Sequence, residues 1–282
     1  MDPEEHRVEA RERWERIAGG WGSDAAAPFF DGTAPVAHWM VERLEPQPGQ
    51  RVLEVAGGRG DVGLLAAELL HPGGTLIETD GAEAMVELAK RRAAELGIRN
   101  AEFRPMELEW LDERTASLDG LLARFAYMHA VDPEAALREA RRVLRPGGRL
   151  VAAVWDTPEH NPWLAAVPEA AAALGLAPPL PADEPGAFRL SAPGRIDELV
   201  EDAGFDEPVI EPIELRFEAP SMDAFWESVR ETSSTMRPII DALSPADHYR
   251  LRDAVEERWA PYAGENGAVS IPGRAVGVVA EA

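Results

Sequence analysis

The chain has 282 residues and a formal net charge of −23, and it contains no cysteine. The absence of cysteine excludes disulfides, thiolate metal sites and cysteine nucleophiles. Because acidic residues dominate the stretch from Asp183 to Glu231, a surface for nucleic acid or an anionic membrane is disfavoured there. No apolar signal core opens the chain and no apolar run reaches transmembrane length, so we expect a cytoplasmic protein without membrane insertion.

Two helices are expected before the first strand. Residues 5–18 have an amphipathic pattern that ends at a pair of glycines, and a second helix is expected to begin near Thr33. Between them lies a predicted loop with the aromatic residues Trp21, Phe29 and Phe30. These side chains fit a pocket wall as well as they fit simple burial. We interpret residues 1–46 as an N-terminal helical cap.

A strand, a glycine-rich turn and a helix follow each other directly after this cap. Residues 51–55 are mostly apolar and rich in valine, which predicts a buried strand, and residues 61–70 are good helix formers. The turn between them, residues 56–60, carries three glycines. Such a turn lets the backbone approach a ligand closely, and the N–H groups that open the helix can bind it. We therefore predict a nucleotide-sized site at the carboxyl end of this strand.

Strands and helices alternate from Arg51 to Trp155. Further strands are predicted at residues 75–79, 101–104, 118–126 and 149–155, with helices between most of them. This alternation predicts an α/β protein with a doubly wound, mostly parallel sheet. The pattern then loosens, and we divide the rest of the chain into three parts. A core is expected over 47–220, a helical lid insertion over 221–266, and a last core strand over 267–282.

Residues 58–63 match the GxGxxG pattern, and Asp80 follows Gly60 at the spacing of an acid that binds a ribose. Taken alone, this pattern indicates an NAD(P)-dependent oxidoreductase. Two features weigh against it. Glu54 lies inside the strand before the glycines, where a dehydrogenase strand is apolar, and no second mononucleotide-binding half follows. The histidines show no metal-ligand spacing, so no metal site is predicted.

Three stretches in the right order resemble the class I S-adenosylmethionine (SAM) dependent methyltransferases. They are Val52 to Gly60, Ile77 to Asp80 and Leu144 to Leu150. Within that class the chain is similar to the ubiquinone/menaquinone-biosynthesis type and to related small-molecule enzymes. The resemblance implies a seven-stranded, Rossmann-like methyltransferase fold. It also implies that SAM is the cofactor and that S-adenosylhomocysteine is a product.

The family's cofactor-binding positions transfer to this sequence one by one. The turn would wrap the methionine part of SAM, with Glu54 beneath it orienting both the turn and the ligand's ammonium group. Asp80 would accept hydrogen bonds from the ribose hydroxyls. The remaining positions implied by the resemblance would flank the ribose, the adenine and the methionine end. The whole set is Glu54, Ala56, Gly57, Gly58, Gly60, Asp80, Gly81, Met85, Met106, Glu107, Leu108, Arg124 and Phe125.

Several of these positions depart from the family pattern. The family usually has glycine where this chain has Ala56, and aspartate where it has Glu54 and Glu107. These departures leave open a protein of the same fold that binds SAM without transferring its methyl group, or that uses the site for other chemistry. Asp80 has a second interpretation as a helix N-cap.

The resemblance implies a methyl acceptor that is a small organic metabolite, such as a secondary metabolite or a quinone. Methylation at oxygen, carbon or nitrogen all remain open, and nothing in the sequence predicts an oligomeric state. Trp21, Phe29 and Phe30 are the predicted acceptor-binding residues. His129 is the predicted catalytic base, because it follows the strand whose carboxyl end faces the acceptor. An imidazole with a pKa near neutrality could remove a proton from a phenol or enol. Trp14 and Trp155 are interpreted as core residues.

Overall fold

The computed structural model describes residues 3–181 and 183–282, so residues 1 and 2 of the expected cap and residue 182 of the expected core lie outside the described residues. A seven-stranded sheet has the order β3-β2-β1-β4-β5-β7-β6. Strands β1 to β5 pair in parallel, whereas β7 runs antiparallel to both β5 and β6. The strands are β1 Arg51–Glu54, β2 Thr75–Asp80, β3 Ala101–Pro105, β4 Leu118–Arg124, β5 Leu144–Trp155, β6 Val209–Ala219 and β7 Val269–Glu281. The predicted doubly wound, mostly parallel sheet is confirmed.

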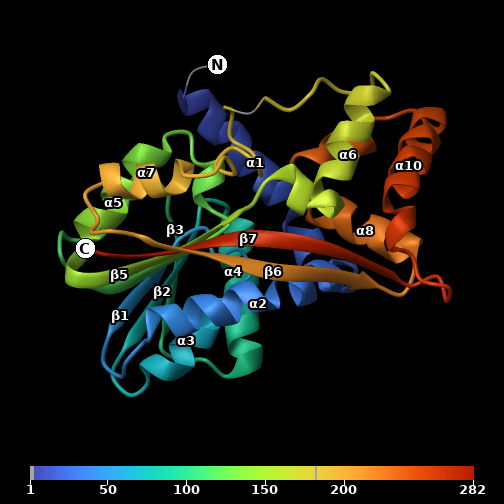
Figure 1. The fold of residues 1–282 in the computed structure, drawn as a ribbon. Helices are drawn as coiled ribbons and strands as arrows, with labels where there is room; N and C mark the ends of the chain where they lie inside the picture. Colours follow the sequence, from blue (N-terminus) through green and yellow to red (C-terminus); the bar gives the residue numbers. More distant parts are fainter. Residues whose placement is uncertain (1–2, 182) are drawn as a thin grey trace.

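Helices cover both faces of this sheet, with α2 and α3 on one side and α5 and α7 on the other (Figure 1). Those that precede or cross the parallel strands are α1 Pro3–Trp21, α2 Ala27–Leu44, α3 Gly63–Leu70, α4 Glu83–Leu96 and α5 Pro133–Val143. Those that follow are α6 Pro162–Ala173, α7 Arg195–Asp202, α8 Met222–Thr232, α9 Met236–Asp241 and α10 Pro245–Trp259. Helices α8 to α10 lie between β6 and β7 in the chain. None of the described helices is long and apolar enough to cross a membrane.

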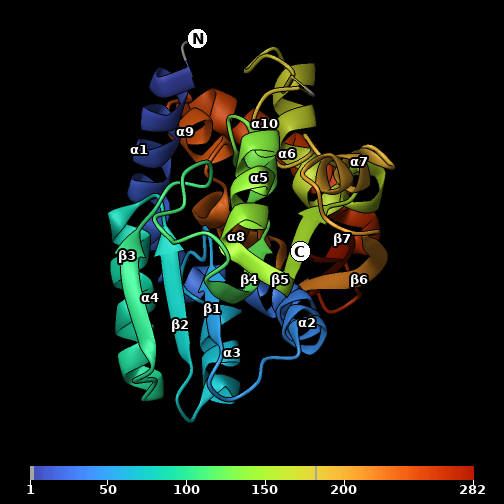
Figure 2. The same ribbon diagram turned by 90° about the vertical axis from the view of Figure 1, so that its left-hand side faces the viewer.

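The strand order reverses next to β1, and this reversal positions the site. The chain winds outward from β1 to β2 and β3, then returns to place β4 on the other side of β1. Loops at such a reversal diverge and leave a crevice outside the carboxyl ends of the strands. In Figure 2 the helices α1, α6 and α9 gather above the arrowheads of the strands, and so cover that edge.

The predicted aromatic loop before the second helix is wrong. Trp21 is the last residue of α1, while Phe29 and Phe30 lie in the first turn of α2, which begins at Ala27 and not near Thr33. Pro28 occupies one of the first two helical positions, where its missing N–H group costs nothing, so the helix can start early.

The first helix is tied to the start of α4. A small apolar cluster of Ile17, Ala18, Ala82 and Met85 joins the two helices. The Glu15 carboxylate accepts hydrogen bonds from the backbone N–H groups of Glu83 at 2.5 Å and Ala84 at 3.1 Å. Because the first N–H groups of a helix have no partner within it, this carboxylate caps α4 from another helix. The contact places α1 beside the carboxyl end of β2.

Candidate functional site

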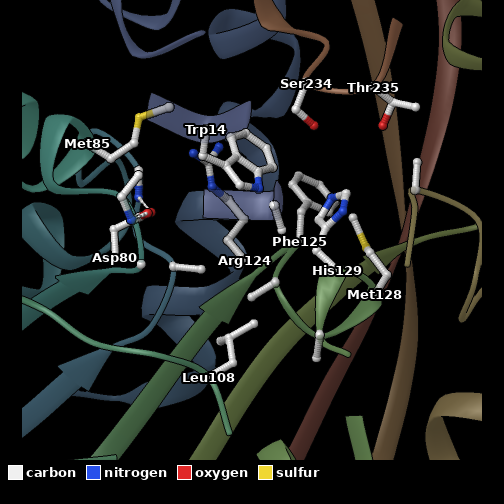
Figure 3. Close-up of a pocket in the computed structure, with 18 of the residues that line it drawn as sticks. Trp14, Asp80, Met85, Leu108, Arg124, Phe125, Met128, His129, Ser234 and Thr235 are labelled. Carbon is white, nitrogen blue, oxygen red and sulfur yellow. Dashed lines mark hydrogen bonds between the residues drawn. The ribbon is translucent and has the colours of Figure 1, made fainter. Parts of the chain in front are cut away.

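A pocket lies at the carboxyl edge of β1, β2 and β4 and is roofed by α1 and by the segment that joins α8 to α9 (Figure 3). Most of the residues predicted from the sequence line it. These are Trp21, Phe29, Ala56, Gly57, Gly58, Asp80, Gly81, Met85, Met106, Glu107, Leu108, Arg124, Phe125 and His129. Glu54, Gly60 and Phe30 do not line it. The Phe30 ring instead lies under the guanidinium group of Arg59, whose central carbon is 3.2 Å from the ring centroid.

The turn after β1 has room only for glycine at its centre. A Cβ atom on Gly57 would lie 1.9 Å from a carboxyl oxygen of Glu78. A Cβ atom on Gly58 would lie 2.7 Å from the Trp21 ring, and Gly58 has a φ angle of +61°. The turn is held by hydrogen bonds from Gly57 N–H to the Thr79 carbonyl and from Gly58 N–H to the Asp80 carboxylate. Backbone therefore forms this wall of the pocket.

Ala56 and Phe125 line the pocket with strained backbones. Their φ angles are 48° and 54°, in the left-handed region that side chains other than glycine rarely adopt. Phe125 stacks on Trp155 with 3.7 Å between ring centroids and 11° between ring planes. Strain of this kind costs on the order of 1–3 kcal/mol and is found at ligand sites. Ala56 therefore adopts a backbone conformation that glycine would adopt without strain.

Two buried carboxyl groups lie behind the turn. Glu54 and Glu78 have 0% and 1% of their surface exposed. A Glu54 oxygen accepts a hydrogen bond of 2.6 Å from the Gly63 N–H group that opens α3. Burial raises the pKa of Glu54 to about 7, and burial together with the neighbouring Glu54 carboxyl raises the pKa of Glu78 well above its usual range. Glu54 thus fixes the turn to α3 from behind and does not reach the pocket.

Asp80 ends β2 and faces the pocket. Its two carboxylate oxygens accept hydrogen bonds from the backbone N–H groups of Gly58 at 3.0 Å and Ala82 at 2.9 Å. Burial raises the pKa of this carboxyl to about 6. The helix-cap interpretation does not hold, since the N–H groups that open α4 bond to Glu15. A carboxylate has about four lone-pair sites, so Asp80 can still accept two further hydrogen bonds.

The pocket wall beyond Asp80 is apolar and closed by ion pairs. Met85 and Met106 are buried, and Leu108 lies on the same side. A Glu107 oxygen lies 3.6 Å from the position of a Cβ atom on Gly81. From α1, Arg11 binds Glu107, and Arg7 lies 3.8 Å from Glu109. Helix α1 therefore closes this side of the pocket with charged contacts.

Arg124, at the end of β4, is held from two sides. Its guanidinium group donates hydrogen bonds to Asp61 at 2.9 Å and to the Thr33 hydroxyl at 3.1 Å. Asp61 also binds Arg59 and Arg92, and the charges of Arg124, Arg59 and Arg92 lower its pKa despite burial, which acts in the opposite direction. The Arg124 charge is therefore compensated within the protein.

His129 lies in the short 3₁₀ helix after β4, against the ring of Trp14 at 5.5 Å between centroids. Burial, with the charge of Arg13, lowers the pKa of His129 to about 4. The expected pKa near neutrality is therefore wrong, because packing beside Trp14 and the charge of Arg13 both disfavour the protonated ring. At pH 7 this imidazole is neutral and is a weak base.

Aromatic residues from distant parts of the chain complete the pocket near His129. Trp21 contacts Trp14 edge to face at 5.4 Å and donates a hydrogen bond to the Thr232 carbonyl at 3.1 Å. The pocket is also lined by residues that sequence patterns do not assign to it, namely Trp14, Met128, Trp155, Trp163, Ser234 and Thr235. The polar run at residues 232–235 is visible in the sequence as a break between helices. Only the fold shows that it faces the pocket.

The described residues contain no group of three or more His, Asp or Glu side chains that could hold a metal ion. The ligand suggested by the lining is therefore the one that Asp80, the glycine turn and the apolar wall can hold together. An acid beside a glycine turn at a strand-order reversal is the arrangement that binds a nucleoside with an attached charged tail.

Comparisons with known proteins identify the family. A family model described as a methyltransferase domain matches residues 46–177. Nocamycin O-methyltransferase of Saccharothrix syringae is 32% identical over 220 residues, which cover 71% of this chain and 77% of that protein. The ubiquinone/menaquinone biosynthesis C-methyltransferase UbiE of Teredinibacter turnerae is 27% identical over 164 residues. That alignment covers 55% of this chain and 65% of UbiE, slightly less than two thirds of the relative.

The solved structure of the (4+2)-cyclase SpnF has the same fold, with a TM-score of 0.59 at 20% identity, and covers 92% of this chain and 85% of its own. The NAD(P)-dependent alternative is set aside, because β7 runs antiparallel between β5 and β6, whereas the dinucleotide-binding fold has a mostly parallel sheet of another strand order. The chain belongs to the class I SAM-dependent methyltransferases, and SAM is its cofactor.

Proposed function

We propose that the protein transfers the methyl group of SAM to an oxygen, carbon or nitrogen atom of a small organic metabolite, of the secondary-metabolite or quinone kind. One observation carries this proposal. The pocket runs without interruption from Asp80, through the turn and Phe125, to a region of aromatic side chains around His129. A nucleoside and an apolar acceptor would thus meet inside one enclosed space.

The residues of the first half fit SAM. Asp80 has acceptor capacity left for the two ribose hydroxyls, and the backbone of Gly58 donates to the same carboxylate. Met85 and Met106 would flank the adenine ring, and Glu107 would accept a hydrogen bond from its amino group. The turn from Ala56 to Gly58 would wrap the methionine part with backbone. Glu54 would act only through the turn, as a positioning residue.

Methyl transfer from SAM requires no covalent bond between the protein and the methyl group. SAM supplies a methyl group that is already activated by its positive sulfur. The chain's residues would align the acceptor atom with that methyl group and exclude water, which accounts for much of the rate enhancement of such reactions. Trp21 and Phe29 would contact the acceptor, and Phe125 would limit how far the acceptor enters the pocket.

We further propose that residues 1–46 form the cap and residues 221–266 the lid over a core of 47–220 and 267–282. Helix α1 and the α8–α9 segment both contribute to the pocket lining, which supports this division. Enclosure by these two elements would exclude water during transfer.

Isothermal titration calorimetry with SAM and S-adenosylhomocysteine tests the cofactor assignment, and mass spectrometry of an acceptor panel tests methyl transfer. Binding of both ligands together with a mass gain of one methyl group is expected. Binding without any methylated product would favour the alternative in which the fold binds SAM for other chemistry. If the folded protein binds neither SAM nor S-adenosylhomocysteine, the proposal is wrong.

A further inference from the structure

Every charged side chain that lines the pocket already has a partner in the described structure. Arg11 binds Glu107, and Arg7 lies beside Glu109, which also accepts the Val131 N–H group. Arg124 binds Asp61, and Asp80 holds two backbone N–H groups. No lining side chain therefore offers an uncompensated charge to an acceptor molecule.

The half of the pocket beyond Phe125 contains aromatic rings and neutral polar groups. The lining from α2, β5 and α6 there is Phe29, Trp155 and Trp163. The segment between α8 and α9 contributes Ser234 and Thr235, and β4 leads to His129. Rings on several sides leave a space suited to a flat, apolar skeleton.

Ser234 and Thr235 present free hydroxyl groups to this space. Neither side-chain oxygen has a hydrogen-bond partner among the described residues, and Thr235 does not cap α9 with its side chain. Figure 3 shows both hydroxyls directed toward the cavity above Phe125 and His129. The neutral imidazole of His129 adds one N–H donor. Together these groups can donate hydrogen bonds to an oxygen atom without supplying a charge.

No group in this half is suited to remove a proton from a weak acid. The charge of Arg13, on α1, acts on His129, and Arg7 and Arg11 of the same helix line the pocket. Among the lining carboxyl groups, Asp80 and Glu107 lie in the cofactor half. Glu109 lies beside the segment that follows His129, and its carboxylate is occupied by the N–H groups of Val131 and Asp132 and by Arg7. His129 has a pKa lowered to about 4, so a phenol of ordinary acidity, with a pKa near 10, would give up its proton to it very unfavourably.

We propose that the acceptor is a flat, apolar molecule whose nucleophilic oxygen is already ionised at neutral pH, held by Ser234, Thr235 and His129. Its chemical class is an acidic enol, an acidified phenol or a conjugated carboxylic acid. This inference rests on the proposed methyl transfer. It specifies an oxyanion-binding site made of neutral donors, with the positive sulfur of SAM as the nearest uncompensated charge.

The proposed step balances without a base in the protein. The acceptor loses its proton to solvent before it binds. An oxygen lone pair then forms the new O–CH₃ bond, and the electrons of the S–CH₃ bond return to sulfur, which becomes a neutral thioether. The products are a methyl ether, enol ether or methyl ester and S-adenosylhomocysteine.

The test compares three coumarins that share one skeleton, titrated by calorimetry into protein saturated with S-adenosylhomocysteine. 4-Hydroxycoumarin is an enol ionised at neutral pH, 7-hydroxycoumarin is a weaker phenolic acid, and 4-methoxycoumarin has no acidic oxygen. At about pH 6.5 the enol should bind at least about tenfold more tightly than the other two, as hydrogen bonds to a charged oxygen predict. Between about pH 6.5 and about pH 9 the affinity of 7-hydroxycoumarin should rise by a similar factor while that of the enol stays constant.

A double variant, Ser234→Ala with Thr235→Val, should weaken binding of ionised 4-hydroxycoumarin about tenfold and leave 4-methoxycoumarin unchanged. Thr115→Val, at an exposed threonine outside the pocket, is the matched control and should change neither. Binding of S-adenosylhomocysteine should be the same in all three proteins.

The outcomes separate this proposal from the one it rests on. Equal affinity for the ionised and the methoxy probes, or the same pH dependence for both acids, overturns the ionised acceptor. The absence of binding by any coumarin overturns the acceptor class, provided that S-adenosylhomocysteine still binds. If the parent protein does not bind S-adenosylhomocysteine, the methyltransferase proposal itself is overturned.

Discussion

The two halves of the pocket are built in different ways. The cofactor half consists of backbone and carboxylates at the ends of β1 and β2, residues that lie within a short span of sequence. The acceptor half takes its aromatic rings and hydroxyls from α1, α2, α6 and the α8–α9 segment, which are far apart in the chain. The first half depends on the geometry of one turn, and the second depends on how helices pack over the sheet.

This difference indicates which property each half controls. A backbone turn with one acidic side chain can bind only a narrow range of ligands, because substitution does not exchange backbone atoms. Side chains on packed helices can be replaced one at a time. Substitutions in the two halves should therefore have separable effects on cofactor binding and on acceptor binding.

The largest effect is expected at Asp80. Asp80→Ala should weaken SAM binding by about 1–3 kcal/mol, because the ribose hydroxyls lose a charged acceptor. Asp80→Asn keeps one acceptor oxygen and should lose less. Calorimetry with SAM measures both, with Asp112→Ala as an exposed control outside the pocket. If both Asp80 variants bind SAM like the parent, the ribose assignment is wrong.

The buried carboxyl pair predicts a dependence of stability on pH. The folded protein holds protons on Glu54 and Glu78 more tightly than the unfolded chain does. This contribution to stability is complete below about pH 4.5 and is lost as the pH rises through about 7, the pKa of Glu54. Glu78→Gln removes the like-charge partner, so it should reduce the loss between pH 5 and pH 8 by about 1–3 kcal/mol.

Urea denaturation at those two pH values measures the effect of Glu78→Gln. Glu68→Gln, at an exposed glutamate on α3, is the control. An unchanged pH slope in Glu78→Gln would show that repulsion between the two carboxyls does not set the pH dependence of stability.

A smaller, stabilising effect is expected at Ala56. Because its φ angle of 48° strains a side chain, Ala56→Gly should raise the free energy of unfolding by about 0.5–1 kcal/mol despite the greater flexibility of glycine. Ala34→Gly, inside α2, should lower it by about 1 kcal/mol. Thermal denaturation of both variants gives the sign of the change in stability. If Ala56→Gly is less stable than the parent protein, the backbone at Ala56 is not strained.

The smallest effect is expected at His129, where the two interpretations of this residue differ most. His129→Gln keeps a hydrogen-bond donor but cannot accept a proton, so turnover at saturating SAM should fall by less than about threefold if the imidazole only positions the acceptor. A true general base would cost on the order of a hundredfold. Such a loss, with SAM binding unchanged, would restore the catalytic base predicted from the sequence.

Sequence patterns predicted the sheet and most of the cofactor half, because strand ends and turns are local features. Gly58 and Asp80 meet through adjacent parallel strands, and a parallel sheet aligns their carboxyl ends. The acceptor half was harder to predict. Phe29 and Phe30 were expected together in a loop, but successive residues of a helix point in different directions, so only Phe29 lines the pocket.

Other parts of the site depended on contacts that no local pattern encodes. The ion pair of Arg11 and Glu107, which closes one side of the pocket, joins residues far apart in the chain, and either charge alone looks like an ordinary surface residue. The low pKa of His129 follows from packing against Trp14, which the sequence could not place beside it. The ion pair and the lowered pKa both depend on contacts between residues that are distant in the chain.

The contact of Trp21 with Gly58 also bears on how such a protein can diversify. The indole fills the space that Gly58 leaves open, and its N–H group binds the main-chain carbonyl of Thr232 rather than a side chain. Any amino acid at position 232 supplies that carbonyl. The side chains of the α8–α9 segment can therefore be replaced, which would change the molecule that the segment recognises. The hydrogen bond from Trp21, which packs on the glycine turn, would be kept.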